Sequence, residues 1–379
     1  MKTDKTKQPG QFKYISLGDI HLGHRKTPTS HIIKNLELLI HDDLLKSLDM
    51  VIITGDLFDR QLVNGDELVH EINRWMTTLL MKCARHDVML RIVEGTPSHD
   101  RMQPKFFIEQ RANAQIPVDL HYASELSIEY IERIDAYFLY VPDKWRPSTA
   151  ITLSEVKQLL ELHKITQVDF AIMHGAFAYQ YPDVVPEPTH DEAEYLAIVK
   201  YQILIGHVHI STVRDRIYAA GSFDRLGHND EIPKGMFSIT VKESGEYTAT
   251  FVENRKAKQY VTLNVHEMNT KELFNEIKTK ALTLPPYSAI RLRCEPNAVA
   301  TGDVETFRIE YPQYHWSTDI QRPDKKKETI NESLINFDMS KYIDITAQSI
   351  SELLIEDLCR ITSDEQMHSN CLERLEGLL

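Results

Sequence analysis

The feature that most constrains the fold is the regular return of short apolar runs through the first half of the chain. These runs are rich in Ile, Val, Leu and aromatic residues and have the length of β-strands; they lie at Tyr14–Leu17, Met50–Thr54, Met89–Val93, Ala136–Val141, Val168–Met173 and Gln202–Ile205. Amphipathic segments of helical length lie between several of them, at Ile32–Leu48, Asp66–Arg85 and Thr152–His163. Alternation of this kind predicts a layered α/β domain.

Acidic and imidazole side chains stand at or just after the ends of the apolar runs. They occur in the segments Gly18-Asp19-Ile20-His21, Gly55-Asp56-Leu57-Phe58-Asp59-Arg60, Gly95-Thr96-Pro97-Ser98-His99-Asp100, Met173-His174-Gly175 and Gly206-His207-Val208-His209. Open α/β sheets bind ligands at the carboxyl ends of their strands, and divalent cations take oxygen and imidazole ligands. The set therefore predicts a centre for two divalent metal ions, with metal-assisted phosphoester hydrolysis as the first hypothesis.

In this order the segments resemble the signature of the calcineurin-like metallophosphoesterase superfamily, which runs DxH, GDxxD, GNHD or GNHE, a lone H and GHxH. Within that superfamily they are most similar to the SbcD-type DNA nucleases, the nuclease subunits of the SbcC–SbcD recombination and repair complex. The resemblance covers roughly the first two-thirds of the chain. It implies a layered metallophosphoesterase sandwich with exonuclease or endonuclease activity on DNA.

The resemblance also implies which residues bind each ion. The first ion would be held by Asp19, His21, Asp56 and His209. The second would be held by Asp56, His174 and His207, with Asp56 bridging the two. A bridging carboxylate brings two ions to roughly 3.5–4 Å, so that both contact one phosphate and lower the pKa of a shared water. Manganese is the expected metal, because a mixed oxygen and imidazole set suits Mn, Fe or Zn better than Mg.

His99 stands in the place of the family's general acid, with Asp100 as its orienting neighbour. A protonated imidazole there can donate its proton to the leaving oxygen. The chain departs from the family at the residue before this histidine, where Ser98 replaces an asparagine and an insertion separates it from Gly95. A serine hydroxyl is a weaker neutral ligand, so the second ion is expected to bind loosely through Ser98, or else through water or Thr96.

A later segment, Ala220-Gly221-Ser222-Phe223-Asp224-Arg225, resembles the family's glycine-serine loop after GHxH. Ser222 and Arg225 are therefore candidates for contact with a substrate phosphate. An ordinary turn between two strands is an equally good interpretation.

Charge and composition limit the remaining possibilities. The 43 basic and 56 acidic residues give a net charge of −13, which argues against a broad non-specific DNA-binding surface, although bound cations and a partner subunit can supply positive charge. The four cysteines lack a CxxC spacing, so neither a zinc ribbon nor a disulfide framework is expected. No apolar run approaches the roughly 20 residues of a membrane span, and no signal-peptide core is present, so a cytoplasmic protein is expected.

The sequence predicts three parts. Residues 1–255 would form the nuclease domain, completed by hairpin strands at Arg216–Ala220, Met236–Val241 and Thr248–Val252. Residues 260–340 would form a small α+β cap, with elements at Tyr260–Val265, Lys271–Leu282, Ala289–Cys294 and Asp303–Glu310. Residues 343–379 would form a tail of two amphipathic helices, Ser349–Arg360 and Ser363–Leu378, that docks a partner.

A P-loop is absent from the sequence, so any dependence on ATP would come from another chain. The resemblance implies DNA, an SbcC-type coiled-coil ATPase and a second copy of the chain as partners. Two alternatives remain open. One is a small-substrate phosphodiesterase or a protein phosphatase of the same superfamily, and the other is a scaffold subunit whose altered Ser98 segment has lost its chemistry.

Overall fold

The computed structural model describes residues 10–321 except 64, 145–147, 182–187, 229 and 297. The chain divides into two units, Met1–Ile320 and Gln321–Leu379, and every element described below belongs to the first. The two predicted tail helices, and the predicted cap beyond residue 321, lie outside the described residues. Among the helices that are described, none has both the length and the apolar content that crossing a membrane requires.

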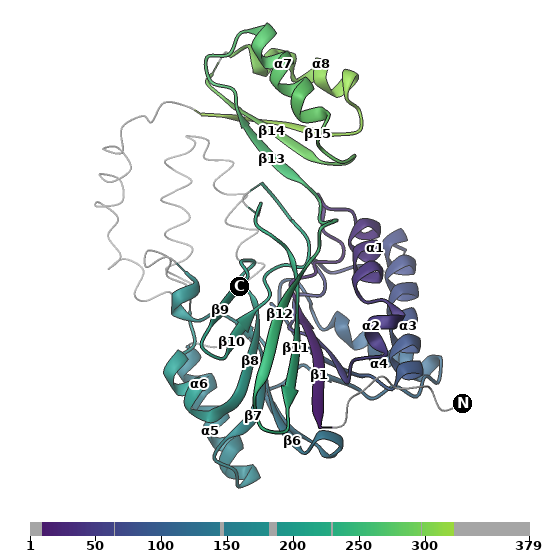
Figure 1. The fold of residues 1–379 in the computed structure, drawn as a ribbon, viewed down its shortest axis with the longest axis vertical. Coiled ribbons are helices and arrows are strands. Elements are labelled where there is room, and N and C mark those ends of the chain that lie inside the picture. The colour runs from purple at the N-terminus through teal and green to yellow at the C-terminus, as the bar shows by residue number, and fades with distance from the viewer. Residues whose placement is uncertain are drawn as a thin grey trace, which may run out of the picture. The chain divides into compact units, whose positions relative to one another are not determined.

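Two six-stranded sheets form the centre of the structure (Figure 1). The first has the strand order β12 (Tyr247–Glu253), β11 (Gly235–Lys242), β1 (Gln11–Leu17), β2 (Met50–Ile53), β3 (Met89–Val93) and β4 (Leu120–Ala123). The second has the order β5 (Ser127–Ile131), β6 (Ala136–Val141), β7 (Val168–Gly175), β8 (Val199–His207), β10 (Ile217–Ala219) and β9 (Thr212–Arg214). Strands β1 to β4 are parallel, as are β6, β7, β8 and β10. Antiparallel pairing is found for β11 and β12 beside β1, for β5 beside β6 and for β9 beside β10.

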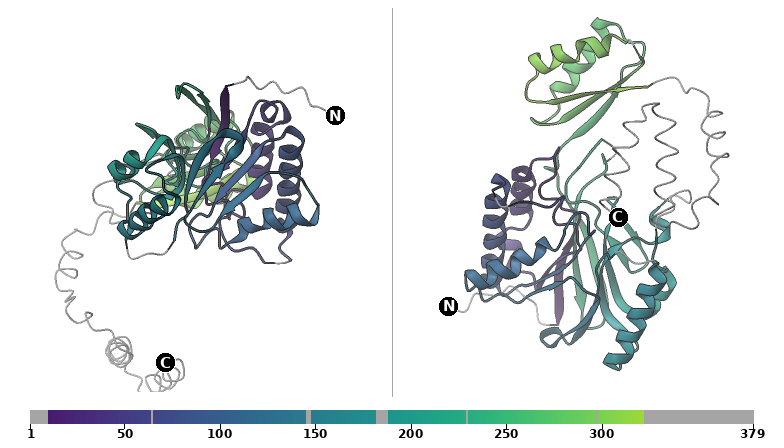
Figure 2. Two further views of the ribbon diagram at one scale, coloured as in Figure 1. Left: turned by 90° about the horizontal axis from the view of Figure 1, so that it is seen from below. Right: turned by 180° about the vertical axis from the view of Figure 1, so that it is seen from behind.

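Helices cover the outer face of each sheet (Figures 1 and 2). The first sheet carries α1 (Thr29–Leu39), α2 (Asp42–Leu45), α3 (Glu67–His86) and α4 (Phe106–Asn113). The second carries α5 (Thr149–His163) and α6 (Glu192–Ile198). Three apolar cores separate the four layers, one under each set of helices and one between the sheets, where Tyr14 packs with Phe138 and Phe170. This arrangement confirms the predicted layered α/β sandwich.

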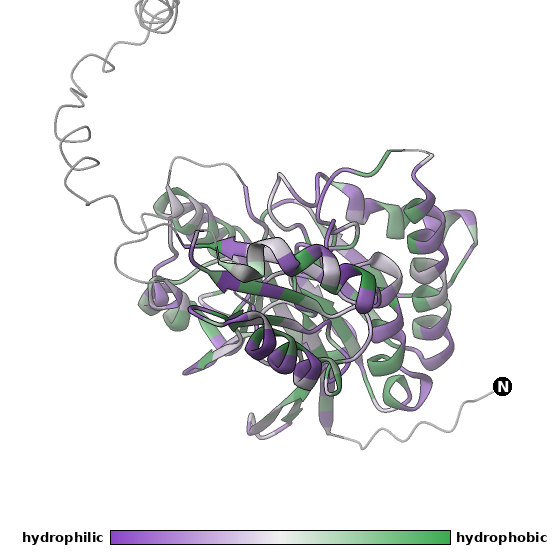
Figure 3. Cartoon of the chain, turned by 90° about the horizontal axis from the view of Figure 1, so that it is seen from above, coloured by the Kyte–Doolittle hydropathy of each residue, from purple (hydrophilic) through white to green (hydrophobic). Residues whose placement is uncertain are grey.

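The sequence pattern explains these layers. All four residues of β2 are buried, as expected for a central parallel strand that is covered on both faces. Helix α3 instead buries one stripe that includes Ile72, Trp75 and Leu79. Hydrophilic and hydrophobic residues accordingly lie side by side on the helices in Figure 3. The single helix predicted over residues 32–48 is wrong, because the chain leaves the helical conformation at Ile40 and α2 begins anew with His41 as its N-cap.

Residues 260–320 form a third, separate sheet with two helices. Its elements are β13 (Tyr260–Asn264), α7 (Thr270–Ala281), β14 (Ala289–Cys294), α8 (Val299–Glu310) and β15 (His315–Ile320). The three strands are parallel and enclose their own apolar core, in which Ile290, Leu292 and Phe307 are fully buried. The last strand was not predicted, because Trp316 is its only buried residue and polar side chains fill most of the rest.

Candidate metal centre

The predicted metal ligands meet at the carboxyl ends of strands from both sandwich sheets. Asp19 and His21 follow β1, Asp56 follows β2, His174 lies near the end of β7, His207 ends β8, and His209 comes just after it. The parallel strands of each sheet all end at this edge, so residues far apart in the sequence are brought together. Two groups of possible ligands result.

The first group consists of Asp19, His21 and His209, whose ligand atoms lie within 4.8 Å of one another. His21 Nε2 and His209 Nε2 are 3.1 Å apart, and His209 Nε2 lies 3.9 Å from Asp19 Oδ1. Ligands bound at about 2.0–2.2 Å to one ion lie roughly 3 to 3.5 Å from each other, or further across an octahedron. The group therefore has the dimensions of a single cation site.

The second group consists of Asp56, His174 and His207. His174 Nε2 lies 3.3 Å from Asp56 Oδ2, and the same oxygen lies 3.9 Å from His21 Nε2 of the first group. A single carboxylate oxygen thus faces both groups. This is the position that a bridging ligand between two ions requires.

Burial and charge also fit cation binding. Asp19 and Asp56 are almost fully buried, and a buried carboxylate needs a positive partner. Burial by itself lowers the pKa of His174, but the carboxylate of Asp56 outweighs burial and raises the pKa to about 10. Burial likewise raises the pKa of Asp56, yet His174 and His21 hold that pKa below its usual range. Without an ion, a proton on His174 provides the charge that a metal would bring, so the buried Asp and His residues can hold a metal ion.

The backbone is strained where it presents these ligands. Positive φ angles occur at Asp19 (48°), His21 (54°), Asp56 (48°) and His207 (108°). Such conformations cost about 1–3 kcal/mol each and persist only when surrounding contacts impose them. The carbonyl oxygen of Asp56 supplies one such contact, since it accepts hydrogen bonds from the backbone N–H groups of Ile20 (2.8 Å) and His21 (3.0 Å). The turns after β1 and β2 therefore hold each other in place.

Groups behind the ligands orient two imidazole rings. His174 Nδ1 lies 2.7 Å from the carbonyl oxygen of Thr54, so Nδ1 carries a proton and Nε2 faces the site. His21 Nδ1 lies 3.2 Å from Asp59 Oδ1, which leaves its Nε2 for the first group. Asp59 belongs to the second motif, but the sequence assigns it no role, because only the folded chain shows which nitrogen it faces.

His99 lies beside the first group, with its ring centroid 4.9 Å from that of His21. Its Nδ1 is 2.8 Å from the carbonyl oxygen of Asp59, so Nδ1 carries a proton and Nε2 is left for a substrate. His21, Asp59 and His99 also form a third group of possible ligands that shares His21 with the first.

Asp100 does not orient His99, contrary to expectation. It is fully buried, and its two carboxylate oxygens accept hydrogen bonds from the backbone N–H groups of Phe58 and Gly95, each at 2.8 Å. Asp100 therefore ties the loop after β3 to the loop after β2. The carbonyl oxygen of Asp59 takes the orienting place that the sequence assigned to Asp100.

Ser98 does not reach either group of ligands. The residue is exposed, and its carbonyl oxygen accepts a hydrogen bond from Arg101 Nε at 3.2 Å. Thr96 lies at the second group instead, where its hydroxyl oxygen is 3.2 Å from Asp56 Oδ2. The loop between β3 and His99 thus turns so that the hydroxyl of Thr96, and not that of Ser98, faces the ligands.

Ser222 and Arg225 have internal partners and do not face a substrate site. Ser222 is fully buried and its hydroxyl donates to Asp230, while the guanidinium of Arg225 donates to the carbonyl oxygens of Glu231 and Ala257. The loop at residues 220–225 instead supports the first group, because the Ser222 N–H donates to the carbonyl oxygen of His209 at 3.2 Å.

A buried lysine adds to this support. The side chain of Lys234 is 1% exposed, pairs with Asp230 and donates to the carbonyl oxygen of His209 at 2.8 Å. Sequence reasoning missed Lys234, because a lone lysine between a loop and a strand carries no signal that it will be buried.

A cavity of about 210 Å³ adjoins the second group. Thr96, His174 and His207 form its inner wall, and Lys144, Ser148, Thr149 and His190 are among the residues that line the rest. Part of a substrate can therefore lie directly against the second group.

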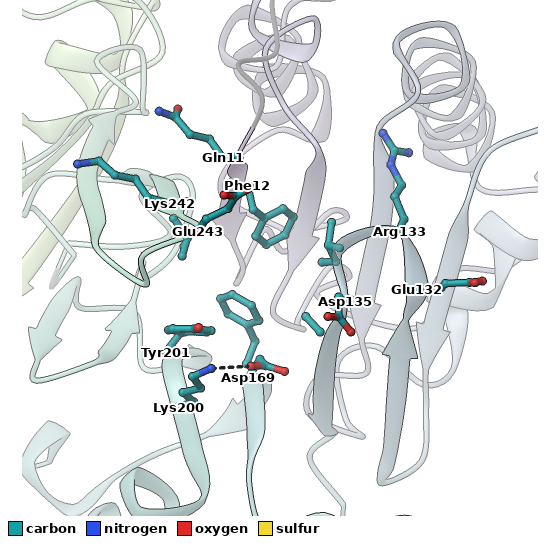
Figure 4. Close-up of a pocket in the computed structure, with 15 residues that line it drawn as sticks. Gln11, Phe12, Glu132, Arg133, Asp135, Asp169, Lys200, Tyr201, Lys242 and Glu243 are labelled. Atoms are coloured by element: carbon teal, nitrogen blue, oxygen red, sulfur yellow. Dashed lines mark ion pairs between the residues drawn. The ribbon is translucent and has the colours of Figure 1, made fainter.

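A wider cavity of about 590 Å³ lies at the opposite ends of the strands, near the starts of β1, β6, β7 and β8 (Figure 4). Phe12 contributes to its lining, and Lys200 faces Asp169 at 3.8 Å, as the dashed line shows. It contains none of the metal-site residues, so it lies apart from both ligand groups.

Comparison with known proteins yields little. No family model and no curated protein matches the chain. Among solved structures, the crystal structure of TT1561 of Thermus thermophilus aligns with a TM-score of 0.37 at 10% identity, over 63% of this chain and 98% of that one. A second crystal structure aligns with a TM-score of 0.37 at 12% identity, over 64% of this chain and 99% of the other. Likeness at this level supports no conclusion.

Proposed function

We propose that the chain is a two-metal phosphodiesterase of the calcineurin-like superfamily that cleaves DNA, as the nuclease subunit beside an SbcC-type ATPase. The observation that carries the proposal is the position of Asp56 Oδ2, which lies 3.3 Å from His174 Nε2 and 3.9 Å from His21 Nε2. Two ligand groups that share one carboxylate are what a two-ion centre for phosphoester hydrolysis needs. The order of the motifs along the sequence supports the same superfamily.

Two divalent cations, when bound, would activate a water as the nucleophile and offset negative charge on the phosphate. The chain's own residues would hold the two ions and control the departing proton. As the bond from water oxygen to phosphorus forms and the bond to the leaving oxygen breaks, protonated His99 would give the proton on Nε2 to the leaving oxygen. The contact between His99 Nδ1 and the Asp59 carbonyl oxygen fixes the ring orientation, so that Nε2 is left for this transfer.

Two exposed basic residues that follow His21 closely in the sequence support a nucleic acid as the substrate. Arg25 and Lys26 are exposed a few residues after His21, and buried Lys258 donates from Nζ to the carbonyl oxygen of Lys26 at 2.5 Å. Exposed Arg25 and Lys26 would attract a polyanion to this part of a chain whose net charge is −13.

A nuclease assay tests the proposal. Metal-stripped protein would be supplied with Mn²⁺ or Mg²⁺ and mixed with end-labelled single-stranded, blunt and hairpin DNA, with chelator as the control. Cleavage that depends on the added ion supports the proposal. Faster turnover of p-nitrophenyl phosphate than of bis-p-nitrophenyl phosphate, without DNA cleavage, would favour a phosphatase. Protein that binds less than one ion per chain and cleaves nothing would favour the scaffold.

A further inference from the structure

Given the two-metal function proposed above, we propose that the hydroxyl of Thr96 is the fourth protein ligand of the second metal ion. Thr96 Oγ1 lies 3.2 Å from Asp56 Oδ2, 3.3 Å from His174 Nε2 and 3.4 Å from His207 Nδ1. One hydroxyl oxygen is thus nearly equidistant from the ligand atoms of all three residues in the second group.

These separations match a four-ligand cage. Asp56 Oδ2 and His174 Nε2 are themselves 3.3 Å apart, so four of the six edges between the four atoms measure between 3.2 and 3.4 Å. The centre of a regular tetrahedron with such edges lies about 2.0 Å from each corner, which is the distance at which zinc-like ions bind nitrogen and oxygen ligands. The atoms therefore surround a space of the right size for one ion.

Hydrogen bonds hold the backbone of Thr96 in a position from which its hydroxyl faces the second group. Its N–H donates to Asp56 Oδ1 at 2.6 Å, which leaves Asp56 Oδ2 for the ions. Its carbonyl oxygen accepts from the N–H groups of His99 (2.8 Å) and Asp100 (3.0 Å). The tight turn that these bonds close carries Ser98 to the surface and keeps Thr96 at the bottom of the site.

With Thr96, each ion would have four protein ligands when the shared Asp56 is counted for both, so burial decides which site binds metal first. His209 of the first group has a side chain that is 37% exposed, whereas His174 is fully buried. The second group should therefore bind the first equivalent of metal, and loss of the Thr96 hydroxyl should reduce this preference.

A cysteine exchange tests for direct ligation in the full-length protein. Thr96→Cys places a thiol at the proposed vertex, and Ser98→Cys places the same thiol two residues away on the surface. Titration with Co²⁺ should produce a thiolate-to-cobalt charge-transfer band in the near ultraviolet for Thr96→Cys, beyond the wild-type background, and none for Ser98→Cys. Absence of the band from a folded Thr96→Cys protein that binds Co²⁺, or an equal band from both variants, would overturn the assignment.

An affinity measurement covers the case in which Thr96→Cys does not fold. Thr96→Val keeps the shape of the side chain without its hydroxyl, and Thr96→Ser keeps the hydroxyl. Calorimetry with Mn²⁺ should show the tighter site weakened about 10–100-fold in Thr96→Val and nearly unchanged in Thr96→Ser. Equal affinity in all three proteins would overturn the assignment of Thr96 alone. Failure of the wild type to bind any Mn²⁺ or Co²⁺ would instead refute the two-metal function.

Discussion

The backbone N–H of His207 donates to both carboxylate oxygens of Asp19, at 2.9 and 3.0 Å. Asp19 follows a strand of the first sheet and His207 ends a strand of the second, so this contact joins the two halves of the sandwich at the metal centre. The bond comes from the main chain, so it does not depend on the His207 imidazole. Because the His207 side chain belongs to the second group and its N–H supports the first, a side-chain substitution can test the two groups individually.

His207→Ala should remove the second ion and leave the first. The N–H bond to Asp19 persists in the variant, so the first group keeps its shape. Elemental analysis after reconstitution with Mn²⁺ should fall from about two ions per chain to about one. His209→Ala serves as the counterpart, because it should spare the second group. Loss of both ions in His207→Ala, with the fold intact, would show that the groups are not independent.

His99→Ala should abolish cleavage while the bound metal stays nearly unchanged. His99 is proposed to donate a proton to the leaving oxygen, and removal of a general acid slows a reaction by roughly 10²–10⁴-fold. Single-turnover cleavage of labelled DNA gives the rate, and elemental analysis gives the metal content. Full activity in the variant, or loss of both ions, would rule out this division of roles.

Stability of the metal-free protein should fall as the pH rises from about 6.5 towards 10. The pKa of His174 is raised in the folded chain to about 10 from an ordinary 6.5, so its proton stabilises the fold fully below pH 6.5 and is lost as the pH approaches 10. Thermal melts of chelator-treated protein at a series of pH values measure the effect.

The same melts with saturating Mn²⁺ are the control, because an ion that replaces the proton on His174 should flatten the dependence. Calorimetry near pH 7.5 in buffers of different ionisation enthalpy should also detect about one proton released by the second ion. A metal-free melting temperature that is constant across this range would contradict the charge pairing of Asp56 with His174.

Gly55→Ala should destabilise the fold and disturb the second group. Gly55 has a φ of 87°, and a Cβ there would stand 2.3 Å from His174 Nδ1, so the ring would have to shift. Overpacking of this kind costs roughly 1–3 kcal/mol in the free energy of unfolding, measured by urea titration. Gly65→Ala is the matched control, since Gly65 also has a positive φ (108°) but no atom within 4 Å of its Cβ position. Equal losses in both variants would mean that backbone strain alone accounts for the effect.

Removal of the residues after Ile343 should leave metal-dependent cleavage intact and prevent binding of the ATPase partner. Every candidate ligand precedes Ile210, and the removed segment carries the two predicted amphipathic helices. Co-purification of full-length and truncated chains with an SbcC-type protein, together with a DNA cleavage assay, measures both effects. A folded truncated chain that still co-purifies with the ATPase would refute the docking role of the tail.

Sequence patterns predicted the buried strands well, because burial on both faces demands an uninterrupted apolar run. Met89–Val93 and Ala136–Val141 were predicted with the bounds that the structure has. The strand β8 begins before its apolar run, because buried Val199 still pairs with Val168 of β7. The register shifts between this pair and Gln202, and Lys200 and Tyr201 at that irregularity interrupt the apolar pattern. Edge strands such as β5 and β9 were missed, because a strand with one open side carries polar residues.

The sequence likewise predicted only part of the candidate site. Residues that follow strands were brought together as predicted, because strand ends place them there whatever the loops do. The loop after β3 was harder to predict. Ser98 was the predicted ligand because it directly precedes His99 in the sequence. The N–H groups of His99 and Asp100 donate to the Thr96 carbonyl oxygen, however, and the resulting turn places Thr96, and not Ser98, at the second group. Support by Lys234 depends on burial, which no local pattern of the sequence reveals.

The order of strands in the first sheet bears on how the chain is made. Strand β1 lies between β2 and β11, and Gln11 pairs with Lys242, so the entire second sheet is synthesised before β1 gains its second neighbour. A nascent chain that has just emerged past His209 would hold every candidate ligand, yet one edge of its first strand would still be open to other chains. A chain truncated after β10 but before Gly235 would therefore carry every candidate ligand and yet be prone to aggregate.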